Sequence, residues 1–278
     1  MIRFGAPLPA PESPEAWVRT VRENGYNAAY VPLTEKASVS ERKEYRQAAE
    51  EADIVLAEVG AWSNLVSPDS GIREAAFRMN VDRLRLADDM GARCCVDVTG
   101  SKGTYWCGAD PGNYDPGTYD EIVDVVRRIL DEADPKETYY SVELMQWAVP
   151  DSADSYLSLI RDVDRDRFAV HLDPVNILNS PDKYYANGDI IRDAFRKLGP
   201  YIRSCHAKDV IMSPDFLVHI SETPIGTGIL DYRAYFEELV RLPEVPLMLE
   251  HLPDQAAYRR AAEVLRRRAR EWGFELPG

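Results

Sequence analysis

The stretch SVELMQW, residues 141–147, is the first of four segments that share one pattern; the others are HLDPVN at 171–176, SCHAKD at 204–209 and LMLEHL at 247–252. In each segment, a run rich in Val, Ile, Leu or Cys ends at a residue that can bind a metal ion: Glu143, Asp173, His206 and Glu250. Such runs are typical of buried parallel strands, so each of these residues is predicted at the carboxyl end of a strand. Active sites of (β/α)₈ barrels are built at those ends.

The four residues together predict a metal site. Three carboxylates and one imidazole that converge on a point would repel unless a cation joined them. Ligands that are mostly oxygen suit Mn²⁺, Mg²⁺ or Co²⁺ better than a closed tetrahedral zinc site, and Mn²⁺ is our first choice. A single Glu at a strand end is usually a salt-bridged rim residue, but four such residues in this arrangement favour a shared metal site.

Apolar strand-like runs alternate with helical patterns along the whole chain. Strands are predicted at residues 2–4, 28–31, 54–59, 93–98, 140–144, 168–173, 202–206 and 247–250, and helices at 15–23, 119–133, 189–198 and after Ser40, Asp69, Asp151 and Asp254. This alternation predicts a parallel sheet. The length of 278 residues suits one barrel, which typically takes roughly 250 residues. We therefore expect a single-domain (β/α)₈ TIM barrel over residues 1–278.

Composition argues against several classes of function. The formal charge of −14 disfavours a nucleic-acid partner, because phosphate binding needs a clustered basic surface. The sequence has no apolar run of about 18 residues for a membrane span and no signal-peptide pattern, so we expect a cytoplasmic protein with no membrane partner. The four cysteines follow neither a disulfide nor a zinc pattern and are interpreted as reduced thiols.

Three further polar residues lie near the predicted site. His171 precedes Asp173 by two residues and is expected one layer deeper, as a hydrogen-bonded core histidine. Lys208 shares the parity of His206, so it contacts either the substrate or a nearby carboxylate. His219 lies in the long segment 212–228, where it is either catalytic or a loop-bracing residue.

Aromatic residues gather in the loops that follow the strands. Trp62, Trp106 and Trp147 follow the third, fourth and fifth predicted strands, so they are candidates for stacking on a sugar, although one or two could only wedge loops onto the barrel. Asn64 and Gln146 are candidates for binding its hydroxyls. Tyr184 and Tyr185 are weaker candidates, because the helix at 189–198 could bury them. The connections at 99–117 and 212–228 are long, and the second is expected to act as a lid.

These motifs resemble the xylose isomerase-like TIM-barrel superfamily of sugar phosphate isomerases and epimerases. The resemblance rests on the four ligand types in order, with His206 in an HxKD motif at 206–209, and extends to GAWSN at 60–64, MGAR before the fourth strand and PIGTGILDY at 224–232. It covers essentially the whole chain.

The resemblance implies a mechanism. In such enzymes a divalent metal holds a carbonyl and a neighbouring hydroxyl of the substrate, and two glutamates flank one carbon from opposite faces. Glu143 and Glu250 would transfer the proton by way of a metal-stabilised enediolate, while Asp173 and His206 would act mainly as ligands.

Two positions depart from the ketose 3-epimerases of this superfamily. Asn176 stands where those enzymes carry a histidine, and Met212 where they carry an arginine; both positions hold substrate hydroxyls in them. We therefore expect Asn176 to select the substrate, a sugar or related polyol ketone, rather than to perform chemistry.

Several functions remain open. Isomerisation or epimerisation is the first choice, and a lyase of the inosose or dehydroshikimate dehydratase type, or a C-glycoside-cleaving enzyme, is the alternative. An abasic-site endonuclease of the same fold would need more histidine ligands and a basic groove. A binding or subunit role is disfavoured by the complete ligand set, and a homo-oligomer in which a partner chain completes the site stays open.

Overall fold

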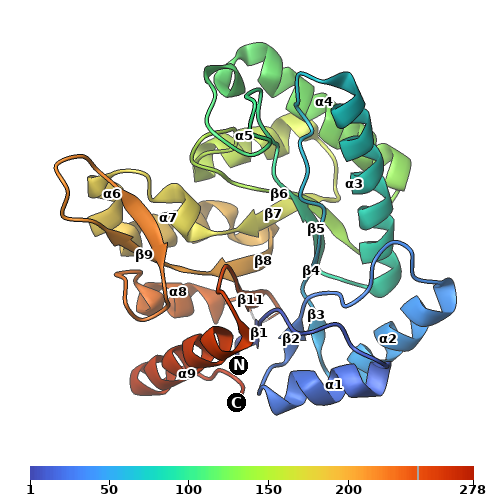
Figure 1. Cartoon of the computed structure of the whole chain (residues 1–278), viewed down its shortest axis with the longest axis vertical. Helices are drawn as coiled ribbons and strands as arrows, with labels where there is room; N and C mark the ends of the chain where they lie inside the picture. The colour runs from blue at the N-terminus through green and yellow to red at the C-terminus, as the bar shows by residue number, and fades with distance from the viewer. Residues whose placement is uncertain (243) are drawn as a thin grey trace.

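The computed structural model describes residues 1–242 and 244–278, and a curled sheet of parallel strands lies at its centre (Figure 1). Seven strands form this sheet in the order β1-β11-β8-β7-β6-β5-β4, and every neighbouring pair is parallel. The strand bounds are Arg3–Gly5 for β1, Ala28–Ala29 for β2, Val55–Leu56 for β3, Glu58–Gly60 for β4, Cys94–Asp97 for β5, Tyr139–Glu143 for β6, Phe168–Leu172 for β7, Ile202–Ala207 for β8, Asp209–Met212 for β9, Ile220–Thr223 for β10 and Pro246–Leu249 for β11.

Strands β2 and β3 pair with each other and bring the two edges of the sheet together. The backbone N–H of Asn27 donates to the Phe4 carbonyl at 3.1 Å, and that of Val31 donates to the Glu58 carbonyl at 3.2 Å. The chain around β2 therefore bridges β1 and β4, which confirms the single-domain TIM barrel. The third predicted strand is divided by one residue, Ala57, into β3 and β4.

Nine helices, counted over the described residues, surround the barrel (Figure 1). Their bounds are Pro14–Glu23 for α1, Val39–Glu51 for α2, Ser70–Met90 for α3, Pro116–Ala133 for α4, Ala153–Val163 for α5, Pro181–Tyr185 for α6, Asn187–Leu198 for α7, Tyr232–Leu239 for α8 and Gln255–Trp272 for α9. Ser13, Asp69 and Asp254 cap α1, α3 and α9 by accepting backbone N–H groups of the first turn, as their position in the sequence predicts. None of the described helices is long and apolar enough to cross a membrane.

The connection after β8 includes the long segment 212–228, the candidate lid. It contains an antiparallel hairpin of β9 and β10, which extends away from the barrel (Figure 1). The side chains at its tip are apolar and exposed: Phe216, Leu217 and Val218.

Asp209, the last residue of the HxKD motif, ties the base of this hairpin to the barrel. Its buried carboxylate accepts backbone N–H groups from Gly226 at 2.9 Å, Gly228 at 3.1 Å and Leu230 at 3.0 Å. A side chain at Gly228 would place its Cβ 2.3 Å from Asp209 Oδ1, so this approach needs glycine. The PIGTGILDY segment at 224–232 therefore anchors the hairpin: its backbone N–H groups bind Asp209, and its glycine at 228 leaves room for that carboxylate.

Candidate metal centre

The four predicted ligands meet at one end of the barrel. Glu143 ends β6, Asp173 follows β7, His206 lies in β8 and Glu250 follows β11. Each offers one ligand atom, and these atoms all lie within 4.8 Å of one another. Glu143, Asp173 and His206 are buried, and Glu250 is partly buried.

The polar atoms at this point fit a divalent cation. Asp173 Oδ2, His206 Nδ1 and Glu250 Oε2 are buried without a hydrogen-bond partner among the described residues. Buried polar atoms are nearly always satisfied, and unsatisfied carboxylate and imidazole atoms that face one another are what a metal site requires. The donor set of three carboxylates and one imidazole suits Mn²⁺, Mg²⁺ or Co²⁺.

The ammonium of Lys208 lies among the same carboxylates. Its Nζ is 2.8 Å from both Asp173 Oδ2 and Glu250 Oε2, and 4.0 Å from Glu143 Oε1, although neither short contact has hydrogen-bond geometry. Burial disfavours the charged amine, but the charges of Asp173, Glu143 and Glu250 outweigh it and raise the pKa of Lys208 well above its usual value. Three carboxylates, one ammonium and one divalent cation would sum to zero charge if His206 is neutral.

His206 contacts carboxylates on both sides of its ring. Nδ1 lies 3.0 Å from Glu250 Oε2 and 3.7 Å from Glu143 Oε1, and Nε2 lies 3.1 Å from Glu58 Oε1. Burial lowers the pKa of His206, but the charge of Glu250 and other nearby acidic groups raises it well above its usual value overall.

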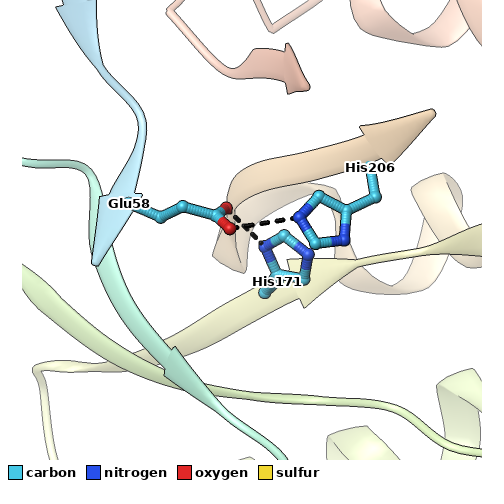
Figure 2. A group of neighbouring side chains, drawn as sticks. All are labelled: Glu58, His171 and His206. Carbon is cyan, nitrogen blue, oxygen red and sulfur yellow. Dashed lines mark hydrogen bonds and ion pairs between the residues drawn. The ribbon is translucent and has the colours of Figure 1, made fainter. Parts of the chain in front are cut away.

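Glu58, which the sequence analysis did not identify, forms a second buried cluster with His171 and His206. Figure 2 shows Glu58 of β4 reaching toward the rings of His171 on β7 and His206 on β8. His171 Nδ1 lies 3.2 Å from Glu58 Oε2. Burial favours the neutral form of Glu58, but the two imidazoles oppose it and lower the pKa of this carboxyl well below its usual range. His171 is fully buried as expected, but neither of its ring nitrogens has a well-formed hydrogen bond among the described residues.

Asn176 contacts one of the candidate ligands. Its side-chain amide donates to Glu143 Oε1 at 2.8 Å. Asn176 lies in the short 3-10 helix Pro174–Ile177. Asp173 caps this helix by accepting the Val175 N–H at 2.9 Å and so holds Asn176 in place. The amide therefore orients a candidate catalytic carboxylate.

A cavity of about 420 Å³ opens beside the ligands. Its walls include Trp17, Tyr30 and Trp62, and the carboxyl-bearing residues Glu58 and Glu250 also line it. This volume lies within the range of roughly 300–1,000 Å³ that is usual for small-molecule sites.

The other predicted aromatic contacts do not line this cavity. Trp106 is 41% exposed in the loop after β5. Trp147 is partly buried, and its backbone carbonyl accepts a hydrogen bond from Asn113 at 2.9 Å. Tyr184 is buried and Tyr185 is 73% exposed.

Asn64 is a candidate for binding substrate hydroxyls, and His219 is either catalytic or a loop-bracing residue. The buried amide of Asn64 joins two loops, because its Nδ2 donates to the Ser101 carbonyl at 2.8 Å and its Oδ1 accepts the Ser101 N–H at 3.0 Å. His219 is exposed in the hairpin, where its backbone carbonyl accepts the Ser213 N–H at 3.0 Å.

Another buried carboxylate, Asp97, lies at the end of β5, next to β4 and β6 in the sheet. Asp97 ends β5 and accepts hydrogen bonds from the Ser63 backbone at 2.7 Å and the Asn80 amide at 2.7 Å. Burial raises the pKa of Asp97 to about 6 despite these donors. Its contacts lie outside the four-ligand cluster.

Comparisons with known proteins agree with this architecture. The family described as xylose isomerase-like TIM barrel matches residues 18–268. Similar solved structures include D-psicose 3-epimerase with D-tagatose from Clostridium cellulolyticum H10, at 17% identity and a TM-score of 0.70 over 99% of this chain and 100% of that chain.

Two other structures are similar at comparable identity. The probable 3-DHS dehydratase AsbF from Bacillus anthracis has 18% identity and a TM-score of 0.69, over 95% of this chain and 98% of that one. A xylose isomerase-like TIM barrel protein from Mycobacterium smegmatis, in complex with magnesium, has 20% identity and a TM-score of 0.63, over 91% of this chain and 87% of that one. No curated protein matches the sequence. At these identities the structural likeness establishes the fold.

Proposed function

Because the chain belongs to the xylose isomerase-like TIM-barrel family, we propose that it is a divalent-metal-dependent enzyme that isomerises or epimerises a sugar or related polyol ketone. The observation that carries this proposal is the convergence of Glu143, Asp173, His206 and Glu250 within 4.8 Å.

The metal would be held by these four residues, with Mn²⁺ as the first choice and Mg²⁺ or Co²⁺ as alternatives. When bound, such an ion stabilises the negative charge that develops on substrate oxygens as a proton leaves the neighbouring carbon.

Two glutamates carry the proton transfer in this proposal. Glu143 ends β6 and Glu250 follows β11, the outer two of the four adjacent strands that carry the ligands, and each offers one oxygen to the cluster. One carboxylate removes the proton beside the carbonyl to give an enediolate, and the other returns a proton. Asn176 supports this role because its amide fixes one oxygen of Glu143, so the carboxylate is already oriented when the substrate arrives.

The cavity limits the substrate to a small molecule. Its indole and phenol walls, Trp62 and Tyr30, suit the apolar C–H faces of a sugar. Glu250 lies on its lining and connects it with the metal ligands.

A lyase of the dehydratase type is the second candidate. Loss of water from the substrate begins with the same proton removal, and the dehydratase AsbF is as similar in fold as the D-psicose 3-epimerase. The amide at Asn176, where ketose 3-epimerases have a histidine, also favours an outcome other than ketose epimerisation.

The deciding experiment uses deuterated buffer, added Mn²⁺ and a panel of ketoses and inososes. Deuterium uptake with an unchanged molecular formula identifies an isomerase or epimerase, and loss of water identifies a dehydratase. Glu143→Gln and Glu250→Gln should each reduce turnover by several orders of magnitude with the fold intact, because an amide cannot accept the substrate proton. Glu237→Gln, which changes a surface glutamate of α8 that pairs with Arg192, is the matched control. A near-native rate in either catalytic variant would contradict the proton-transfer role.

A further inference from the structure

We propose that Glu58 is a positioning residue of the metal centre: it accepts the Nε2–H of His206 and thereby directs Nδ1 of that ring toward the metal ligands. This inference rests on the proposed metal site. It concerns a residue that lies behind the ligand and contributes no atom to the four-ligand cluster.

The contacts around Glu58 form a chain of buried groups. Its Oε1 lies 3.1 Å from His206 Nε2 with hydrogen-bond geometry, and its Oε2 accepts the Ser204 hydroxyl at 2.7 Å. His171 contacts the same Oε2 through Nδ1 at 3.2 Å. Glu58 and His206 are each 1% exposed, and His171 and Ser204 are fully buried. The carboxylate is therefore held at both oxygens before any ligand binds.

The direction of the hydrogen bond follows from chemistry. An ionised carboxylate only accepts, so Nε2 of His206 must carry the proton of the contact. An imidazole that binds a metal ion is neutral, with one protonated and one unprotonated nitrogen, so a proton fixed at Nε2 leaves the lone pair for the metal at Nδ1. That atom is the buried one without a hydrogen-bond partner, and it lies 3.0 Å from Glu250 Oε2. Metal-ligating histidines usually donate their other N–H in this way, and the partner fixes both tautomer and ring orientation.

The packing around the ring supports the same role. The rings of His171 and His206 have centroids 4.1 Å apart at an angle of 72°. The His171 ring therefore packs against the His206 ring, and Nδ1 of His171 also contacts the Glu58 carboxylate that accepts from His206 (Figure 2). Rotation of the His206 ring about its Cβ–Cγ bond would separate Nε2 from Glu58 and break the edge-to-face contact with His171.

Binding of Mn²⁺ to the whole protein tests the proposal, with free Mn²⁺ measured by electron paramagnetic resonance. Glu58→Leu removes the acceptor and should weaken Mn²⁺ binding about 10- to 100-fold. Glu58→Gln keeps an oxygen that can accept Nε2–H, so it should retain more affinity than Glu58→Leu. Asp97→Asn is the matched control, because it changes a buried carboxylate at the next strand end that does not contact His206. It should lower stability and leave Mn²⁺ affinity unchanged.

A second measurement uses the unaltered protein and so does not depend on a variant that folds. Nitrogen-15 NMR of the Cd²⁺ complex should show Nδ1 of His206 bonded to cadmium and Nε2 still protonated. Cadmium bonded to Nε2 would overturn the proposal, as would unchanged Mn²⁺ affinity in Glu58→Leu. Two equivalents of Cd²⁺ per chain, with both nitrogens of His206 bonded, would make Glu58 and His171 ligands of a second ion and would also overturn it. A wild-type protein that binds neither ion would instead contradict the proposed function, and this inference with it.

Discussion

Lys208 supplies the positive charge that balances the carboxylates at the metal centre. Its ammonium is 3% exposed and lies 2.8 Å from oxygens of Asp173 and Glu250. Without a metal ion, this cation and His206 are the groups that keep buried carboxylates from repelling one another. A metal ion held by the four ligands would compete with this ammonium for the carboxylates of Asp173 and Glu250.

Lys208→Met should therefore have opposite effects on two properties. The metal-free protein should lose stability, because buried carboxylates lose their counter-charge, at a cost on the order of 3–5 kcal/mol for a broken buried pair. Mn²⁺ should bind more tightly, because one competing cation is gone. Melting in chelator and Mn²⁺ titration measure the two effects. Lys197→Met is the matched control, since Lys197 also bridges two carboxylates, Asp154 and Asp193, but on the surface of α7. Weaker Mn²⁺ binding in Lys208→Met would show that the lysine supports the metal.

Asn176→Ala should lower kcat more than it raises KM, because the amide that orients Glu143 is lost. A change of on the order of 1–3 kcal/mol in kcat/KM is expected for one buried hydrogen bond. Steady-state kinetics on the best substrate of the panel separates the two constants. Asn179→Ala, which removes an exposed amide in the same connection, is the control. An effect on KM alone would contradict this role and support the substrate-selecting role expected from the sequence.

A functional residue can be located from the sequence when its polar side chain ends an apolar run. Glu143, Asp173 and Glu250 could be located because each ends an apolar run. Glu58 also follows such a run, but Val59 continues the apolar pattern after it, so it looked like an interior residue of the third strand. The contact from Asn176 to Glu143 spans 33 residues and depends on the barrel register, which the sequence alone does not give.

Among the elements, the β9–β10 hairpin is joined to the last barrel strand by an ion pair. Glu222 Oε1 on β10 lies 3.0 Å from Nδ1 of His251, which directly follows Glu250. The hydrogen bond that His251 donates to Glu222 is the main reason that the pKa of His251 is raised above its usual value of 6.5. Since the folded-state pKa is the higher one, this pair stabilises the protein fully below pH about 6.5 and loses its effect as pH rises through the folded-state pKa.

Glu222→Gln should therefore lower the pKa of His251 and reduce stability at pH 6 but not at pH 9. The effect should be below about 1 kcal/mol, because both side chains are partly exposed and solvent screens the pair. Histidine titration by NMR and denaturant unfolding at both pH values measure it. Asp215→Asn changes another carboxylate of the same hairpin and should leave the pKa of His251 unaltered. A pKa of His251 that is the same in Glu222→Gln and wild type would contradict the role of this pair.

Elements with strong local signals were located from the sequence, and elements fixed by distant contacts were not. The helix α1 has its serine cap, its proline at the first position and its glycine after the end, and it begins within one residue of the prediction. The helix α8 was missed, although Asp231 caps it by accepting the Ala234 N–H at 2.9 Å. It has only 8 residues, which is too few for a clear periodic pattern. The hairpin was missed because its exposed strands have no alternation of buried and exposed apolar residues.

For the whole molecule, the metal ion should contribute to stability as well as to chemistry. The ligands come from strands spread over residues 143–250, so an ion that joins them would link β6, β7, β8 and β11 in the native state only. The unfolded chain cannot assemble this set of ligands, so binding favours the native state.

Addition of Mn²⁺ to chelator-treated protein should raise the melting temperature. At a concentration of about 100 times Kd, the gain is roughly 2.7 kcal/mol, which corresponds to about 5–10 °C for a chain of this size. Differential scanning calorimetry with and without chelator measures it. Asp173→Asn should reduce the rise in melting temperature that Mn²⁺ causes. Asp97→Asn should lower the melting temperature of the metal-free protein but keep the same rise on Mn²⁺ addition. Identical melting with and without Mn²⁺ would rule out a site that joins these strands.

The barrel itself was predictable because strand and helix patterns alternate over the full length and the ligand motifs fall at strand ends. The particular backbone contacts that close the barrel were not predictable, because β2 has 2 residues and its bonds to both edges of the sheet join backbone groups that are distant in the sequence.

The hydrogen bonds that Asp209 accepts also affect how the ligand-bearing end of the barrel could change in evolution. They hold the base of the hairpin on both sides, at Asp209 itself and at Gly226, Gly228 and Leu230. Insertions and deletions between residues 213 and 219 leave every one of these bonds in place. Descendants of this sequence could therefore lengthen, shorten or replace the outer hairpin freely while inheriting His206 and Lys208 in unchanged positions.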